Sequence, residues 1–245
     1  MIAHSWRLRA LVKMACAAGA LAGFVLSASA AAQSAETEAE APPQAISDAA
    51  TRVANWIASS GDNGSLPYMI IDKNAATVFL FDAEGKSIGQ APALIGIAPG
   101  DEASPGVGSK DLSKIGPAER TTPAGRYMAK LGRAAGNQRV LWVDYYTSVA
   151  LHPVVTGNRR ERRRERLLTP DAEDNRITFG CINVSPTFFT RSVRPLFQKD
   201  GGIVYVLPDT KPLEEVFPSL YVQPFLDRGL LTPVSSEQSR PLASP

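Results

Sequence analysis

The chain has very little cysteine or histidine: two of each among 245 residues. His4 and Cys16 lie in the first 32 residues, so only His152 and Cys181 belong to the remainder. One cysteine excludes a disulfide within that remainder, and one histidine with one cysteine falls short of the four ligands of a typical zinc site. We therefore expect no metal. A lone thiol together with a lone imidazole instead predicts a cysteine nucleophile and its base.

The first 32 residues have the pattern of a secretion signal. Arg7, Arg9 and Lys13 precede an apolar stretch at 14–26, which small residues follow. This stretch is too short to be a convincing membrane span, so we expect export to the periplasm or cell envelope and no stable membrane anchor after cleavage. The 26 basic residues less these three leave 23 against 24 acidic ones, a balance that gives no reason to expect nucleic-acid binding.

The segment pattern predicts one mainly β domain at 67–208. An Ala/Glu/Pro-rich linker with one short helix at 48–59, capped by Ser47, occupies 33–66, and a Pro-rich tail occupies 209–245. A long segment rich in Gly, Pro and Ser at 99–123 is expected to be a functional loop. The strand-like runs lie at 68–71, 76–81, 125–131, 139–145, 147–151 and 203–207.

The residues around the cysteine and the histidine are suited to acyl transfer. Gly180 permits a tight bend before Cys181, and a helix is expected soon after it, at Ser185 and Pro186, with Pro195 able to kink that helix. Backbone N–H groups at such a turn stabilise a thiolate and an oxyanion. His152 follows the run 147–151 and would emerge at a strand end.

In the catalytic interpretation, the carbonyl of Pro153 is a candidate for orienting the His152 imidazole. The alternative is that Cys181 is a small buried hydrophobic residue and His152 an ordinary polar residue at a strand end, as free cysteines and lone histidines often are.

Three motifs together resemble the L,D-transpeptidase catalytic domain (YkuD-like) family. The sequence Thr-Phe-Gly-Cys-Ile-Asn at 178–183 resembles the family's Ser/Thr-His-Gly-Cys-hydrophobic-Asn/Arg signature. Ala-Leu-His at 150–152 resembles its catalytic-histidine strand, and Thr-Pro-Ala-Gly at 122–125 is similar to its Thr-Pro-x-Gly motif. The motifs occur in the family's order, and the resemblance covers about 68–208.

The resemblance implies a β-sandwich with a few short helices, one of them after the cysteine, that acts on peptidoglycan peptide stems without a cofactor. Cys181 would form a thioester with a tetrapeptide stem, displacing its terminal D-alanine, and His152 would be base and then acid. Backbone N–H groups around Gly180 and Cys181 would hold the oxyanion. The residues expected to bind substrate are Thr178, Asn183, Arg176 and Tyr127.

Two features depart from the family pattern. Phe179 stands where the signature has histidine, and the gap between the catalytic pair is longer than usual. The gap contains an Arg-rich insertion at 159–166, either a basic flap that attracts the carboxylates of peptide stems or a solvated helix held by Glu–Arg pairs. The leading function is an L,D-transpeptidase. The alternatives are an L,D-carboxypeptidase or cross-link-cutting amidase using the same site, and a non-catalytic wall-binding scaffold.

Overall fold

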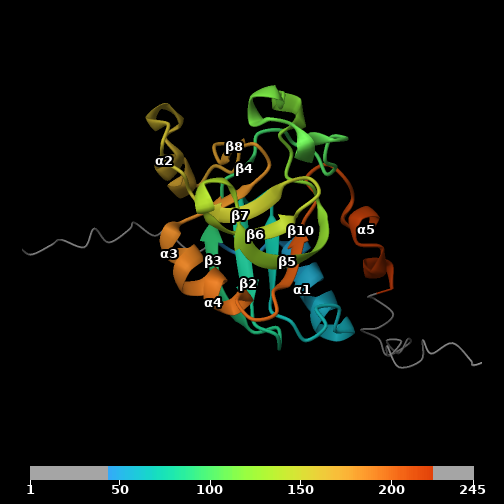
Figure 1. The fold of residues 1–245 in the computed structure, drawn as a ribbon. Coiled ribbons are helices and arrows are strands. Elements are labelled where there is room, and N and C mark those ends of the chain that lie inside the picture. The colour runs from blue at the N-terminus through green and yellow to red at the C-terminus, as the bar shows by residue number, and fades with distance from the viewer. Residues whose placement is uncertain (1–43, 223–245) are drawn as a thin grey trace, which may run out of the picture. The chain divides into compact units, whose positions relative to one another are not determined.

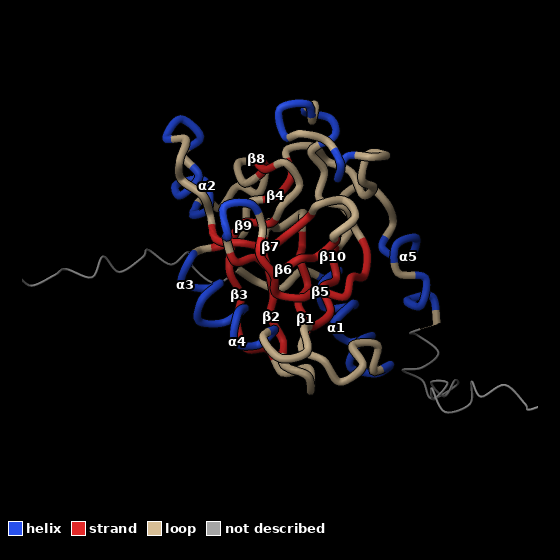
Figure 2. The backbone as a smooth tube through the Cα atoms, in the orientation of Figure 1, coloured by secondary structure: helices blue, strands red, loops and turns tan. Residues whose placement is uncertain are grey.

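The computed structural model describes residues 44–222, and this part is mainly β, as predicted. Eight strands form one mixed sheet in the order β3-β2-β1-β10-β5-β6-β7-β9, and β4 pairs with β8 in a small second sheet (Figures 1 and 2). The strands are β1 (Tyr68–Asp72), β2 (Thr77–Phe81), β3 (Ser87–Pro92), β4 (Ile95–Gly96), β5 (Gly125–Arg133), β6 (Arg139–Asp144), β7 (Val149–Pro153), β8 (Arg176–Thr178), β9 (Ile182–Val184) and β10 (Gly202–Val206).

The large sheet folds over on itself at β5. The first residues of β5 pair with β10, whereas its last four, from Lys130 to Arg133, pair with β6. The half-sheet of β1 to β3 therefore packs against the half-sheet of β6, β7 and β9, with Met69 and Leu80 on one side of the core and Leu141 and Leu151 on the other. This arrangement matches the expected β-sandwich.

Helices at both ends of the described chain cover the outer face of β1, β2 and β10. They are α1 (Asp48–Ser60), whose N-cap Ser47 accepts from the Ala50 N–H, α5 (Leu213–Val216) and the 3₁₀ turn η7 (Pro218–Tyr221). Trp56, Phe217 and Leu220 are buried there with aromatic residues of the sheet. The packed body therefore runs beyond the predicted limits of 67 and 208, because apolar residues on both sides are buried against the sheet.

The helix expected at Ser185 and Pro186 is present and is not broken by Pro195. It consists of α3 (Pro186–Phe188), the π-helical turn η6 (Phe189–Val193) and α4 (Arg194–Phe197). The Arg194 N–H bonds the Phe189 carbonyl, five residues back. Proline has no N–H and its ring crowds the carbonyl four residues earlier, so the wider turn accommodates it inside a continuous helix.

A buried ion cluster ties the tip of the β1–β2 hairpin to two distant segments. The Lys73 side chain is 1% exposed, and the carboxylates of Asp101 and Asp209 beside it are 0% and 2% exposed. Its ammonium group contacts four oxygens: Gly100 O at 2.6 Å, Asp101 Oδ1 at 2.8 Å, Thr122 O at 3.0 Å and Asp209 Oδ1 at 3.2 Å. One side chain therefore fixes both ends of the 99–123 segment and the chain after β10.

The carboxyl group of Asp101 is held ionised within this cluster. Burial by itself would raise its pKa, but hydrogen bonds from Lys73, from the Thr210 hydroxyl and from the N–H groups of Asp209 and Lys211 hold the pKa well below its usual range. A lowered folded-state pKa contributes stability above the unfolded-state value, and that contribution is lost as the pH falls.

Removing the cation should leave the buried carboxylate of Asp101 without a cationic partner, whereas Asp209 keeps its ion pair with Arg176. We expect Lys73→Met to lower the free energy of unfolding by about 3–5 kcal/mol, as for other broken buried pairs. Denaturant unfolding followed by circular dichroism measures this change. Lys199→Met, at a fully solvated lysine, is the control and should stay within about 0.5 kcal/mol. If Lys73→Met lowered the free energy of unfolding no more than Lys199→Met does, the cluster would be dispensable.

Candidate active site around Cys181

Strand pairing brings the histidine motif and the cysteine motif side by side. β7 and β9 run parallel, with Leu151 opposite Ile182 and His152 opposite Asn183. Cys181 lies one residue before β9, at the same edge. His152 and Cys181 are far apart in the sequence because of the long insertion, and the parallel pairing of β7 and β9 brings them close together in space.

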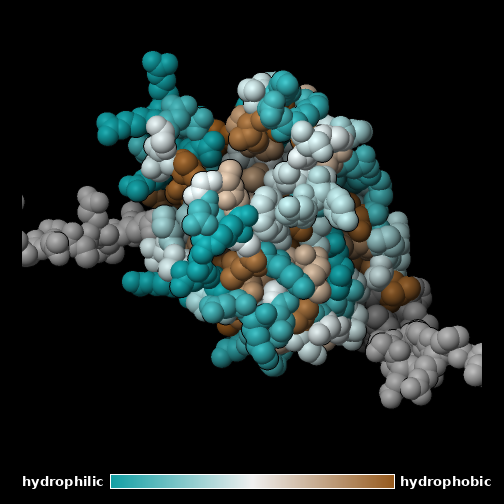
Figure 3. All heavy atoms as spheres, in the orientation of Figure 1, coloured by the Kyte–Doolittle hydropathy of each residue, from teal (hydrophilic) through white to brown (hydrophobic). Residues whose placement is uncertain are grey.

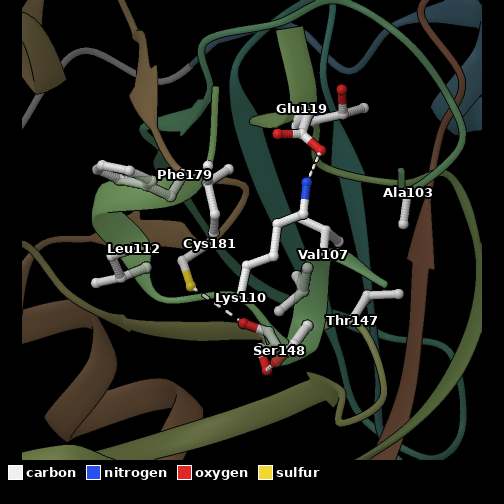
Figure 4. A pocket seen from close by; sticks show the side chains of 13 residues that line it. Ala103, Val107, Lys110, Leu112, Glu119, Thr147, Ser148, Phe179 and Cys181 are labelled. Carbon is white, nitrogen blue, oxygen red and sulfur yellow. Dashed lines mark hydrogen bonds and ion pairs between the residues drawn. The ribbon is translucent and has the colours of Figure 1, made fainter. Parts of the chain in front are cut away.

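The thiol lines a pocket of about 180 Å³, which we call the cysteine pocket. Its other wall is the 99–123 segment, folded into three 3₁₀ turns, η1 (Val107–Ser109), η2 (Leu112–Lys114) and η3 (Pro117–Glu119). Figure 4 shows the Cys181 sulfur directed toward Ser148, whose carbonyl oxygen is 3.7 Å away, with the Lys110–Glu119 ion pair across the pocket. The expected functional loop is thus a wall of the site.

The His152 ring is held on both nitrogens. Nδ1 lies 2.8 Å from the Pro153 carbonyl oxygen, which can only accept, so Nδ1 carries the proton and Nε2 the lone pair. Nε2 is 3.1 Å from Nδ2 of Asn183, which therefore donates to it. In this arrangement the thiol bonds Ser148 and the imidazole bonds Asn183, so the two groups are adjacent in the sheet but not hydrogen-bonded to each other.

Gly180 is required at its position by both conformation and space. Its φ is +119°, and a Cβ there would lie 2.6 Å from the Thr121 carbonyl oxygen. The Gly180 carbonyl accepts from Thr122 Oγ1 at 2.8 Å, and its N–H donates to Thr178 Oγ1 at 3.1 Å. The N–H of Gly180 is therefore already hydrogen-bonded to Thr178. Of the two N–H groups expected to hold an oxyanion, those of Gly180 and Cys181, that of Cys181 makes no such bond to Thr178.

The four residues expected to bind substrate do not line the cysteine pocket. Thr178 is buried, and its hydroxyl bonds the Cys181 carbonyl at 2.6 Å, which shapes the turn. Asn183 is fully buried against His152. Arg176 points into the ion cluster, where it pairs with Asp209 at 2.7 Å. Tyr127 packs on the core, with its hydroxyl 3.1 Å from the Ala124 carbonyl. The four side chains therefore contact the protein's own turn, histidine, ion cluster and core.

Phe179, which stands where the signature has histidine, joins the turn before Cys181 to the pocket wall. The guanidinium of Arg120 lies 3.9 Å from the centre of its ring, and Arg120 also donates to the Ile115 carbonyl. An arginine over an aromatic face is a favourable cation–π contact. Sequence reasoning identified the substitution but not its partner, because Arg120 belongs to an irregular segment whose folding no periodicity predicts.

The Arg-rich insertion reaches the site through one residue. It forms η5 (Arg159–Glu161) and the short helix α2 (Arg163–Leu168). Arg163 Nη1 donates to Asn183 Oδ1 at 2.9 Å, which fixes the amide so that Nδ2 faces His152. The insertion is therefore in contact with the residues behind the histidine and is not merely a solvated helix.

The surroundings favour a neutral thiol and a neutral imidazole. Burial raises the pKa of the Cys181 thiol, opposed by the backbone of Ala150 and by the charge of Arg163. Burial lowers the pKa of His152, opposed by the Pro153 carbonyl and reinforced by Arg163. Both directions disfavour a resting thiolate–imidazolium pair, so any attack by this sulfur would require the thiol to lose its proton as the reaction proceeds.

Residues 44–222 contain no group of three or more His, Cys, Asp or Glu side chains that could hold a metal ion. None of the helices in this range is long and apolar enough to span a membrane. The expected signal at 1–32 and the tail beyond 222 lie outside the described residues.

Neither a protein-family model nor a curated protein matches the chain. Similar solved structures include the catalytic domain of the E. faecium L,D-transpeptidase, at 17% identity and TM-score 0.36, over 58% of this chain and 96% of that one. An L,D-transpeptidase from Mycobacterium smegmatis matches at 14% identity and TM-score 0.34, over 57% and 58%. The helical cell shape determining protein Pgp2 from Campylobacter jejuni matches at 14% identity and TM-score 0.37, over 64% and 55%.

The first two are structures of the family that the sequence motifs resemble, and the match spans less than two thirds of the second and third chains. Identities and TM-scores are low throughout.

The raised pKa of Cys181 predicts slow alkylation. Iodoacetamide reacts with the thiolate, so at neutral pH the folded protein should react more slowly than the same cysteine in guanidinium chloride. Intact mass after timed reaction across a pH series gives the midpoint of the rate, expected above that of the unfolded chain. A midpoint at or below the unfolded value would contradict the assigned environment.

A methyl group at Gly180 should disturb the turn that holds the nucleophile. We expect Gly180→Ala to cost about 1–3 kcal/mol, since alanine would be strained at that φ and its Cβ would meet the Thr121 carbonyl. Gly157→Ala is the matched control, because a Cβ there meets nothing within 4 Å. Thermal unfolding of both variants is the measurement, and equal melting temperatures would refute the close packing at Gly180.

Proposed function

We propose that the chain is an exported L,D-transpeptidase that joins peptidoglycan peptide stems through a Cys181 thioester. The observation that carries the proposal is the state of His152. Its Nδ1 proton is held by the Pro153 carbonyl, so the Nε2 lone pair, which accepts from Asn183, lies on β7 beside the strand that follows Cys181. An imidazole in this tautomer can accept the proton of a neighbouring thiol.

In the first half-reaction, the Cys181 sulfur attacks the carbonyl carbon that precedes the terminal D-alanine of a tetrapeptide stem. The thiol proton passes to Nε2, which requires the sulfur to turn from the Ser148 carbonyl and the imidazole to release the Asn183 amide. The Cys181 N–H stabilises the oxyanion, because the Gly180 N–H is bonded to Thr178. The C–N bond then breaks, His152 gives the proton to the leaving amine, and D-alanine departs.

In the second half-reaction, an amine of another stem attacks the thioester carbonyl. His152 takes a proton from this amine and returns it to the sulfur as the C–S bond breaks, which regenerates the neutral pair. Water in place of the amine would give the carboxypeptidase outcome. The wall of three 3₁₀ turns over the cysteine limits access to the thioester from that side.

A second candidate is a wall-binding scaffold without catalysis. The observation that favours it is the resting geometry, in which the thiol and the imidazole each bond another group. The two candidates make opposite predictions for the thiol, because only the enzyme forms a covalent adduct.

The test is incubation of the protein with peptidoglycan tetrapeptides, followed by intact mass of the protein and by mass analysis of the products. We expect an adduct of the tetrapeptide less D-alanine, free D-alanine and a joined dimer of stems. Cys181→Ala should form no adduct, and Cys181→Ser should lose most of the activity while retaining the fold.

The product pattern separates the alternatives. A shortened stem without dimer would assign the site to hydrolysis. Absence of both adduct and product with competent stems, together with retained binding to isolated cell wall, would replace the enzyme by the scaffold. N-terminal sequencing of the protein recovered from the cell envelope checks the proposed removal of 1–32.

A further inference from the structure

A second hollow, of about 400 Å³, lies within the segment 156–165 and is lined entirely by polar residues. Four arginines, Arg159, Arg162, Arg163 and Arg164, and one glutamate, Glu165, contribute to its surface, and we call it the arginine pocket. Guanidinium groups gathered around one space repel each other, and an anion placed among them removes that repulsion.

Most of these cations have no internal counter-ion. Arg163 pairs with Glu161, whereas Arg159, Arg162 and Arg164 form no ion pair with any of the residues 44–222. Of the two carboxylates of the insertion, Glu161 pairs with one arginine and Glu165 with none among residues 44–222, so three of the arginines that line the pocket keep an unpaired charge. The planar guanidinium fork matches a carboxylate in bidentate geometry, so the pocket suits such an anion.

The backbone supports a shaped pocket. Arg162 has φ 48° and ψ 41°, in the left-handed region that non-glycine residues seldom adopt. It forms the corner between η5 and α2, so arginines before and after it line the same hollow. Strained backbone of this kind gathers at binding sites, where it orients side chains. Figure 3 shows hydrophilic side chains projecting in the region of α2.

The pocket is two hydrogen bonds from the histidine. Arg163 belongs to its lining and donates to Asn183 Oδ1 at 2.9 Å, and the Asn183 amide nitrogen lies 3.1 Å from His152 Nε2. The arginine pocket and the cysteine pocket share no lining residue, and the link between them passes through the buried side chain of Asn183. The proximity to His152 favours a ligand of the active site over an unrelated anionic polymer.

We propose that the arginine pocket binds a carboxylate of the peptide stem that occupies the active site. The inference rests on the proposed function for the identity of the peptide, and it adds the group through which that peptide is recognised. Arg159, Arg162 and Arg164 supply the free guanidinium groups, and Arg163 joins the bound carboxylate to the amide that orients His152.

Binding is measured by calorimetry on the full chain carrying Cys181→Ala, so that turnover does not intervene. The probes are a peptidoglycan tetrapeptide with free carboxylates and the same peptide with its carboxylates amidated. We expect the free acid to bind about tenfold more tightly, as charge-assisted pairing would provide. Adding Arg159→Gln, Arg162→Gln and Arg164→Gln should weaken the free acid about tenfold and remove the difference between the probes.

The matched control carries Arg139→Gln, Arg160→Gln and Arg191→Gln, three exposed arginines that do not line the pocket. It removes the same charge and should keep the affinity within about twofold. Circular dichroism melts of both triple variants verify that they fold.

Equal affinity of the parent and the pocket variant for the free acid would overturn the inference. So would equal affinity of the parent for both probes, or binding only of a phosphate-rich wall polymer. Carboxylate-dependent binding without any Cys181 adduct in the unmodified chain would support the arginine pocket while refuting the transpeptidase. The two proposals therefore fail on different observations.

Discussion

The ammonium group of Lys73 is the contact on which the site depends. It bonds the carbonyl of Thr122, and the hydroxyl of Thr122 in turn bonds the carbonyl of Gly180, the residue before the nucleophile. An ion sealed from water is costly unless every donor finds an acceptor, so its partners can occupy few alternative positions. A cluster far from Cys181 in sequence thereby sets where the turn before Cys181 can lie.

The need to hydrogen-bond buried polar groups also accounts for the positions of the residues that the sequence predicts to bind substrate. Thr178 and Asn183 are polar residues next to a nucleophile, which is typical of substrate contacts, yet they are buried and bond the protein's own turn and histidine. Arg176 is drawn into the ion cluster by Asp209. The polar side chains that line the two pockets come instead from the 99–123 segment and from the insertion, at Lys110, Glu119 and the arginine pocket.

Features that depend on residues close together in the sequence could be predicted from it, whereas features that depend on residues far apart in the sequence could not. The strands β1, β2, β5, β6, β7 and β10 and the helix α1 are predicted because their apolar spacing is local, and Ser47 is identifiable as a cap. The strand β3 is missed, because most of its residues are exposed or half-buried and carry no apolar run. The short strands β8 and β9, with three residues each, carry no measurable periodicity and are fixed by their neighbours. The burial of Lys73 was unpredictable, because its partners lie 28 and 136 residues away.

The contact between Arg120 and Phe179 has a consequence for how the wall of the cysteine pocket responds to its surroundings. Histidine at that position would gain or lose charge between mildly acidic and neutral pH. A phenyl ring does not titrate, so the contact between Phe179 and Arg120 does not depend on the protonation of the side chain at position 179. Phenylalanine at this position therefore replaces a side chain that can titrate with one that cannot, and the contact with the pocket wall is independent of pH at that residue.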